Sequence, residues 1–200
     1  MKTNYDKVLE DNINGLKGRK LSLLLHSCCA PCSTAVISRL KDYFDITIFY
    51  YNPNIEPLEE YLKRKEEQKR IVSEFGIKFL DCDYENEKFK SMSKGLEDLP
   101  EGGYRCHKCY ELRLTKTALT AKENNFLYFG TTLTVSPYKN SQVLNAIGKD
   151  IEELTKVKFL YSDFKKKEGY KLSIELSKKY NLYRQNYCGC IYSKKQSEQN

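Results

Sequence analysis

The chain lacks any apolar stretch long enough to cross a membrane. A transmembrane helix needs about 18 or more consecutive apolar residues, and no window of the 200 residues approaches that length. The N-terminal sequence MKTNYDKVLEDNINGLKGRK also lacks the apolar core of a secretory signal. We therefore expect a cytoplasmic protein with no membrane partner, whose cysteines meet a reducing environment and serve metal binding or catalysis.

A phosphate-binding glycine loop is also missing. Nucleotide-binding α/β domains commonly place such a loop after their first strand, where its N–H groups bind phosphate. Neither GxxxxGK[ST] nor GxGxxG occurs here, and the segment after the first predicted strand reads HSCCAPCS. Thiols at the phosphate position argue against ATP chemistry.

The chain has no internal repeat, no linker and no composition change that would mark a domain boundary. A domain of 200 residues buries roughly 70% of the surface of its unfolded chain, so it does not need disulfides to be stable. We expect one α/β metalloenzyme domain over residues 1–193 and a disordered polar tail over residues 194–200.

The charge is modestly positive. Lys and Arg total 34 against 27 Asp and Glu, a net charge of +7, and the basic residues are spread along the chain. This excess suits a polyanionic partner, but by itself it fits a solvated surface somewhat better than nucleic-acid binding.

Strand-like apolar runs alternate with helical patterns. Strands are expected at 21–25, 45–51, 77–80, 126–130 and 157–161, and helices at 4–16, from 31 onward, at 58–75, within 81–100, and at 105–125, 140–154 and 168–180. This alternation predicts a parallel sheet of about five strands with helices on both faces. Ligands of such sheets bind outside the carboxyl ends of the strands. The segments HSCCAPCS, DCDY and TTLTVSPYKN each follow a strand, so a pocket is expected at the cysteines.

Four of the eight cysteines form two close pairs with metal-binding spacing. Cys106 and Cys109 make a CxxC at the start of a predicted helix, where the helix N-terminus lowers thiol pKa values. Adjacent Cys28 and Cys29 could reach two irons of a cluster from a bent loop. The spacing leaves a four-cysteine zinc site and a 4Fe–4S cluster both open. The adjacent pair favours the cluster slightly, because neighbouring thiolates fit one tetrahedral ion poorly.

The remaining cysteines allow more than one interpretation. Cys188 and Cys190 form a CxC that could close a strained, labile disulfide, with Gly189 giving the backbone freedom, or could supply two more metal ligands. Cys32 could bind a second metal or merely lie nearby. Cys82 is expected to be a small buried hydrophobic residue.

Other polar residues beside these motifs are weaker candidates. A histidine near the cysteines could donate a hydrogen bond to sulfur or carry protons, but coincidence explains the positions equally well. Two residues of the TTLTVSPYKN loop could meet a phosphate or a base, or belong to a plain Pro-containing turn. The candidates are His26, His107, the acids Asp81, Asp83 and Tyr84, and the loop residues Tyr138 and Lys139.

Taken together and in this order, the motifs resemble the cobalamin-independent epoxyqueuosine reductase family. The segments are LLLHSCCAPCS, FYYNPNIEPLEEYLKR, GLEDLPEGGYRCHKCYELRL, GTTLTVSPYKN and YCGC, which span about Leu21 to Ser193. The resemblance implies reduction of epoxyqueuosine to queuosine at the wobble position of tRNA, a two-electron, two-proton reaction that releases water. It also implies an adenine-nucleotide α-hydrolase-like fold and an electron donor, which is unidentified.

The resemblance also implies roles for individual cysteines. Cys28, Cys29, Cys106 and Cys109 would hold a 4Fe–4S cluster, and Cys188 with Cys190 would form a redox-active pair. An additional mononuclear iron is implied beside the cluster, with Cys32 and nearby acids as candidate ligands. The alternatives are a cluster-dependent tRNA-thiolating enzyme, which should carry a phosphate loop, and a zinc-stabilised tRNA-binding module, which would not need seven clustered cysteines. A thioredoxin-like dithiol enzyme fits less well, because that fold does not use a CC pair.

Overall fold

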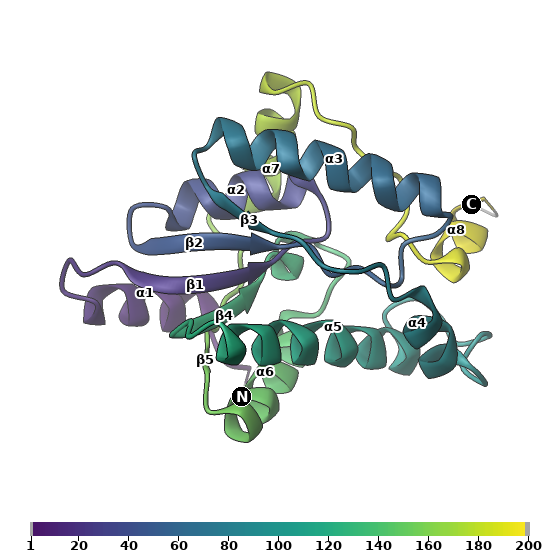
Figure 1. The fold of residues 1–200 in the computed structure, drawn as a ribbon, viewed down its shortest axis with the longest axis horizontal. Coiled ribbons are helices and arrows are strands. Elements are labelled where there is room, and N and C mark those ends of the chain that lie inside the picture. The colour runs from purple at the N-terminus through teal and green to yellow at the C-terminus, as the bar shows by residue number, and fades with distance from the viewer. Residues whose placement is uncertain (1, 199–200) are drawn as a thin grey trace.

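A single five-stranded parallel sheet organises the computed structural model, which describes residues 2–198 (Figure 1). The strands lie in the order β3-β2-β1-β4-β5, and every neighbouring pair is parallel. Their bounds are Leu21–His26 for β1, Phe44–Phe49 for β2, Lys78–Leu80 for β3, Tyr128–Thr131 for β4 and Lys158–Phe159 for β5. The predicted α/β class with a parallel sheet of five strands is confirmed. The likeness to the adenine-nucleotide α-hydrolase fold stays a prediction.

Helices connect the strands and cover the sheet. They are α1 (Tyr5–Gly15), α2 (Ala30–Leu40), α3 (Leu58–Glu74), α4 (Asn86–Ser93), α5 (Tyr104–Glu123), the short 3-10 helix η1 (Leu133–Val135), α6 (Ser141–Thr155), α7 (Gly169–Lys179) and α8 (Ile191–Glu198). No helix within residues 2–198 is both long enough and apolar enough to cross a bilayer.

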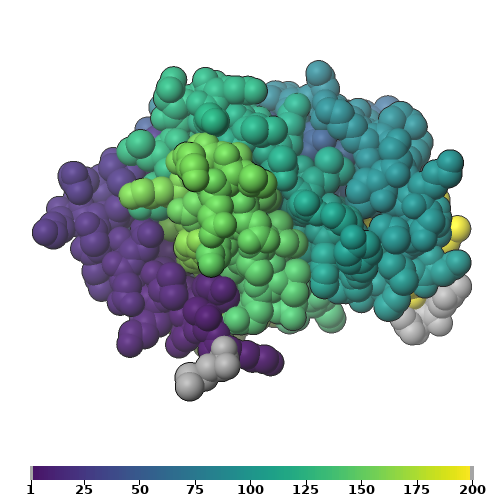
Figure 2. Space-filling view, turned by 90° about the horizontal axis from the view of Figure 1, so that it is seen from below, coloured from purple at the N-terminus to yellow at the C-terminus, as the bar shows by residue number. Residues whose placement is uncertain are grey.

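Both faces of the sheet are buried, and the sequence of β1 shows why. Leu23 and Leu25 pack into one apolar cluster, whereas Leu24 between them packs into another. Successive side chains of a strand point to opposite faces, so an uninterrupted apolar run fits a strand that is covered on both sides. The first cluster includes residues from α1, α2 and α3, and the second includes residues from α5 and α6. Figure 2 shows the side of the molecule that α5 and α6 cover.

The strand order places a switch point at β1. The chain leaves β1 toward β2 and β3 on one side, and β4 and β5 lie on the other side. Connections that run in opposite directions leave a crevice at the carboxyl ends of the central strands, here β1 and β4. The HSCC segment and η1 follow these two strands directly. The fold therefore brings the N-terminal cysteines to the position where such sheets bind ligands.

The end of the chain differs from its prediction. Residues 194–200 were expected to be disordered, but residues 194–198 belong to α8, while 199 and 200 lie outside the described residues. The helix begins at hydrogen bonds that its composition does not reveal. The backbone N–H of Ser193 donates to the Cys190 sulfur at 3.4 Å, and the Cys188 N–H donates to the Ser193 hydroxyl oxygen at 2.9 Å. Cysteine is not an ordinary N-cap residue, so this start signal was missed.

Gly148 gives a direct test of the packing between α6 and the sheet. A Cβ at this position would lie 2.3 Å from a ring carbon of buried Phe159, closer than atoms can approach. We expect Gly148→Ala to lower the free energy of unfolding by about 1–3 kcal/mol, as overpacking in a core does. Gly15→Ala is the matched control, because no heavy atom lies within 4 Å of its added Cβ. Urea unfolding should show no loss for the control, and equal stability of the two variants would contradict the packing described here.

Candidate functional site

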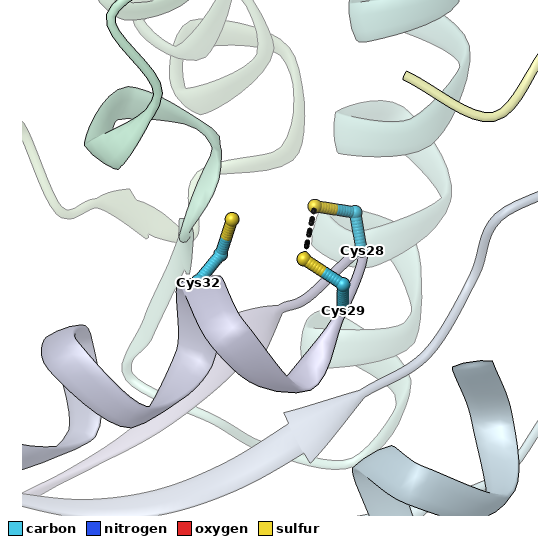
Figure 3. A group of neighbouring side chains, drawn as sticks. All are labelled: Cys28, Cys29 and Cys32. Carbon is cyan, nitrogen blue, oxygen red and sulfur yellow. Dashed lines mark hydrogen bonds between the residues drawn. The ribbon is translucent and has the colours of Figure 1, made fainter. Parts of the chain in front are cut away.

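Three cysteines lie close together at the connection between β1 and α2 (Figure 3). Cys28 and Cys29 occupy the bend after β1, and Cys32 lies in the first turn of α2. Cys29 has extended backbone angles, and the proline that follows Ala30 suits a first helical turn, so the chain bends sharply here. The three sulfurs lie within 4.8 Å of one another, and those of Cys28 and Cys29 are 3.7 Å apart.

The three thiols share their protons unequally. Hydrogen bonding with the Cys29 and Cys32 thiols lowers the pKa of Cys28, and the positive charges of Arg113 and Lys139 act in the same direction. The hydrogen bond to Cys28 raises the pKa of Cys29 to about 12, and the pKa of Cys32 also rises. Three adjoining thiols cannot all ionise easily, and Cys28 is the one whose thiolate form these interactions favour. A bound cation would remove this restriction, because metal binding displaces thiol protons.

The donor set fits a thiophilic metal. Thiolate sulfur is the preferred ligand of zinc and of the irons in iron–sulfur clusters. Among residues 2–198, these three cysteines form the one group of three or more histidine, cysteine or acidic side chains whose ligand atoms all lie within 4.8 Å of one another. From the sequence, Cys32 could bind a second metal or merely lie nearby. In the structure it belongs to this group. Its three sulfurs could hold a metal ion or part of a cluster.

The predicted partners Cys106 and Cys109 are placed on the first turns of α5 rather than within this group. The Gly102 N–H donates to the Cys106 sulfur at 3.2 Å. Burial raises the pKa of Cys106 and that of Cys109, the latter to about 11. Arg113, one helical turn further along α5, reaches to 4.0 Å from the Cys109 sulfur and opposes this rise. Both thiols thus lie near positive charge in a largely buried setting.

Cys188 and Cys190 form the third cysteine pair, and both are free thiols. Gly189 between them has φ +132°, which L side chains rarely adopt, and its Cβ would lie 2.9 Å from Ile55. Its carbonyl accepts a hydrogen bond from the Glu56 N–H at 2.9 Å. Burial raises the pKa of Cys190 to about 12. The glycine is therefore required both by the backbone conformation and by the space around it.

Arg64 of α3 holds this pair in place, a role that the sequence did not reveal. The side chain is 1% exposed, and its guanidinium donates to the carbonyl of Cys188 at 3.1 Å. It also donates to Glu60 at 2.6 Å, which supplies the compensating negative charge. In Figure 1 the start of α3 and α8 lie at the same end of the molecule. The only sequence signal was a Glu–Arg pair at i,i+4, which usually marks a solvated helix face.

A second buried arginine, Arg113, organises the end of β1. It donates to the Asn52 side-chain oxygen at 2.7 Å, and its Nε lies 3.2 Å from His26 Nε2. Nε2 also lies 3.1 Å from the Tyr51 carbonyl oxygen, and Nδ1 lies 3.1 Å from Thr131 Oγ1, so both ring nitrogens have hydrogen-bond partners. Burial and the charge of Arg113 lower the pKa of His26 to about 3. His26 therefore stays neutral and supports the site instead of carrying protons.

A cavity of about 540 Å³ opens beside the cysteines. Cys28 and Cys32 line it from the start of α2, and Cys188 lines it from the loop before α8. Thiols more than 150 positions apart in the chain thus share one space. The other lining residues used below are Glu101, Tyr138, Lys139, Tyr170, Arg184, Tyr187 and Ser193.

The acids predicted from the DCDY segment do not line this cavity. Asp81 pairs with Lys65 at 2.5 Å, and the Tyr84 hydroxyl donates to the Ile55 carbonyl at 2.5 Å. The acid that does line it is Glu101, which accepts a hydrogen bond from the Ser193 hydroxyl at 3.1 Å. Lys139 lines the cavity as well, and its contact with a phosphate or a base stays a prediction. Despite burial, attraction to Cys188 and to the other thiols raises the pKa of Lys139, so it stays charged.

The family model and the related proteins that match this chain all point to the same family. Residues 23–196 match the family model described as epoxyqueuosine reductase QueH. The chain is 46% identical to epoxyqueuosine reductase QueH of Staphylococcus epidermidis, with 96% of this chain and 85% of that protein aligned. It is 43% identical to the Streptococcus pyogenes protein of the same name, over 97% and 79% of the two chains. It is 39% identical to the Thermotoga maritima protein of that name, over 86% and 90%.

The neutral, buried His26 predicts a specific pH dependence of stability. Its pKa is about 3 in the folded chain against 6.5 for a free side chain. The unfolded chain therefore takes up a proton as pH falls below 6.5 while the folded chain does not, so this contribution is complete above 6.5 and is lost toward pH 3. Between pH 7 and pH 5 the loss should be about 2 kcal/mol. Urea unfolding of wild type and His26→Gln at both pH values checks this. Identical pH dependence in the two proteins would contradict the neutral state assigned to His26.

Proposed function

The chain belongs to the epoxyqueuosine reductase QueH family, and on that premise we propose that the thiol-lined cavity is where it reduces epoxyqueuosine to queuosine in tRNA. The enzyme is an oxidoreductase. The observation that carries the assignment of the site is the meeting of Cys28, Cys32 and Cys188 at one cavity. Reduction of an epoxide needs an electron source beside the substrate, and the sulfur side chains are the groups in this cavity suited to hold one.

The reaction sets what the site must supply. Both C–O bonds of the epoxide break, a carbon–carbon double bond forms, and the oxygen leaves as water. This consumes two electrons and two protons. A dithiol that closes to a disulfide releases two electrons and two protons, so Cys188 and Cys190 match the stoichiometry of one turnover. An external electron donor must then reduce the pair again.

We propose that Cys28, Cys29, Cys106 and Cys109 hold a 4Fe–4S cluster and that Cys32 is a ligand of an additional mononuclear iron. When bound, a cluster supplies single electrons and an iron beside it acts as a Lewis acid on oxygen. The close grouping of three sulfurs and the lowered pKa of Cys28 support metal binding by Cys28, Cys29 and Cys32. The hydrogen bond from the Gly102 N–H to the Cys106 sulfur is of the kind that tunes such centres.

The charged groups of the cavity can stabilise negative charge on the departing epoxide oxygen and help to deliver protons to it. Lys139 carries a positive charge that faces the thiols and can stabilise an oxygen that becomes negative as a C–O bond breaks. Glu101 lies in the same cavity, where it positions Ser193 through a hydrogen bond. The two protons that the dithiol releases reach the departing oxygen through this polar wall, and the oxygen leaves as water.

The size of the cavity suits a single nucleobase. About 540 Å³ lies within the range of small-molecule pockets, and a base must leave its stack to reach a buried centre. The wobble base of an anticodon loop is single-stranded, so it can enter at modest cost. The net charge of +7 favours binding of this polyanion.

Metal analysis separates the proposed cluster ligands from the other cysteines. We expect anaerobically purified protein to contain iron and acid-labile sulfide in near-equal amounts, with iron in excess where the additional iron is bound. Cys29→Ser should lose most of both, because it removes a buried thiolate ligand. Cys82→Ser is the matched control, since that thiol donates to the Tyr50 carbonyl at 3.2 Å and lies outside the sulfur group. Zinc in place of iron, or equal iron loss in both variants, would overturn the cluster assignment.

The dithiol is tested by turnover. We expect Cys188→Ser and Cys190→Ser each to retain iron and sulfide but to lose at least about 100-fold in multiple-turnover rate, a loss of roughly 3 kcal/mol in transition-state stabilisation. Queuosine formation in tRNA, measured by mass spectrometry of nucleosides, gives the rate. Full activity of the double variant would refute the redox pair, whereas loss of iron in either variant would show that these thiols are metal ligands instead.

A further inference from the structure

Tyr138 projects from the rim of the cavity in a way that packing does not explain. Its side chain is 80% exposed, more than the other exposed aromatic residues, of which Tyr104 is 55% and Tyr43 44% exposed. Yet it lines the cavity, and its neighbour Lys139 lines the same cavity beside the cysteines. An aromatic ring left in water at the mouth of a pocket is a surface that is available to a ligand.

The backbone fixes the position from which this ring projects. Pro137 restricts the turn, which is closed by a hydrogen bond from the Lys139 N–H to the Ser136 carbonyl at 3.3 Å. On the following side, the Asn140 side chain caps α6 by accepting from the Gln142 N–H at 2.9 Å. Because the turn is already ordered, binding a ligand against this ring does not have to order the backbone as well.

Other residues that line the cavity also suit the binding of a nucleic acid. Tyr170 and Tyr187 line the cavity together with Arg184, whose guanidinium lies 5.9 Å from the centre of the Tyr170 ring. Arg184 also donates to the Ser173 carbonyl at 3.1 Å, which fixes its position. Aromatic rings interleaved with arginine and lysine are the usual platform for single-stranded nucleic acid, because every base has a face that can stack.

We propose that Tyr138 stacks on the base of the nucleotide next to the one that enters the cavity. This inference rests on the proposed function, since it takes the ligand to be an anticodon loop. A base that leaves its stack exposes the face of its neighbour, and the Tyr138 ring replaces the lost partner. Stacking does not read base edges, so the contact serves any neighbouring base. Tyr138 is thus a binding residue of the holoenzyme and takes no part in electron or proton transfer.

Substitution in the anaerobically purified holoenzyme tests the contact. With an anticodon stem–loop that carries epoxyqueuosine, Tyr138→Ala should raise KM by about 10-fold or more with little change in kcat, while Tyr138→Phe keeps the wild-type values. Tyr43→Ala is the matched control, because this exposed tyrosine precedes β2, at the opposite end of the sheet from the cavity. The Tyr138→Ala effect should persist when the neighbouring base is changed. Unchanged KM in Tyr138→Ala, or an equal effect in Tyr43→Ala, would overturn the proposal.

The composition offers a direct readout. The chain contains no tryptophan, so Tyr138→Trp introduces a single tryptophan at the rim, whose emission can be excited apart from that of the tyrosines. Its emission should be quenched on addition of the stem–loop, as stacking on a base requires, whereas Tyr43→Trp should show no change. Binding without quenching would place the base elsewhere and refute the contact. Failure of wild type to reduce the stem–loop would count against the proposed function, and turnover by wild type with unaffected Tyr138 variants would count against the stacking alone.

Discussion

Burial of the parallel sheet on both faces is the constraint from which the rest of the molecule follows. With helices packed on each side, the middle of β1 presents apolar residues in succession, Leu23, Leu24 and Leu25. The reactive side chains of the site lie beyond the strand ends, in loops and on the helices that follow them. Because all five strands run in the same direction, the loops after β1 and β4 meet at one edge, and the chemistry of the protein gathers there.

Two buried arginines contact the cysteines at this edge of the sheet. Arg64 and Arg113 are each 1% exposed and act on different cysteine pairs. Burying a charge is unfavourable unless it is paired and fully hydrogen-bonded. Arg64 meets this condition through Glu60 and backbone carbonyls, whereas the hydrogen-bond partners of Arg113 include the neutral Asn52 side chain and the Cys109 sulfur. The charge of Arg113 lowers the pKa of Cys28 and opposes the rise in the pKa of Cys109, so it favours the thiolate forms that bind metal.

The site combines parts with different roles that lie close together. Cys28, Cys29 and Cys32 form the compact sulfur group at the start of α2. The loop of Cys188 and Cys190 approaches from the far end of the chain, fixed by Arg64 and by the conformation of Gly189. The cavity between them carries a charged lysine inside and an exposed tyrosine at its rim. Such an arrangement can bring a base to a redox centre while the outside of the cavity holds the rest of the nucleic acid.

The sequence by itself determined the α/β class, the five strands within a few residues and the importance of the cysteines, because these depend on local patterns: apolar runs, turn residues and short spacings. It also indicated the epoxyqueuosine reductase family, through motifs whose order and spacing are local features too. Only the tertiary structure decided that Cys32 joins Cys28 and Cys29, that Glu101 rather than Asp81 lines the cavity, and that Arg64 holds the Cys188 loop. These contacts join residues far apart in the chain, or depend on which way a loop turns. A charged residue in a helical pattern reads as a solvated face until a distant loop is seen to pack on it. The helix over residues 194–198 was missed for the same reason, since it begins at hydrogen bonds made by Cys190 and Ser193 after the chain has folded onto the site.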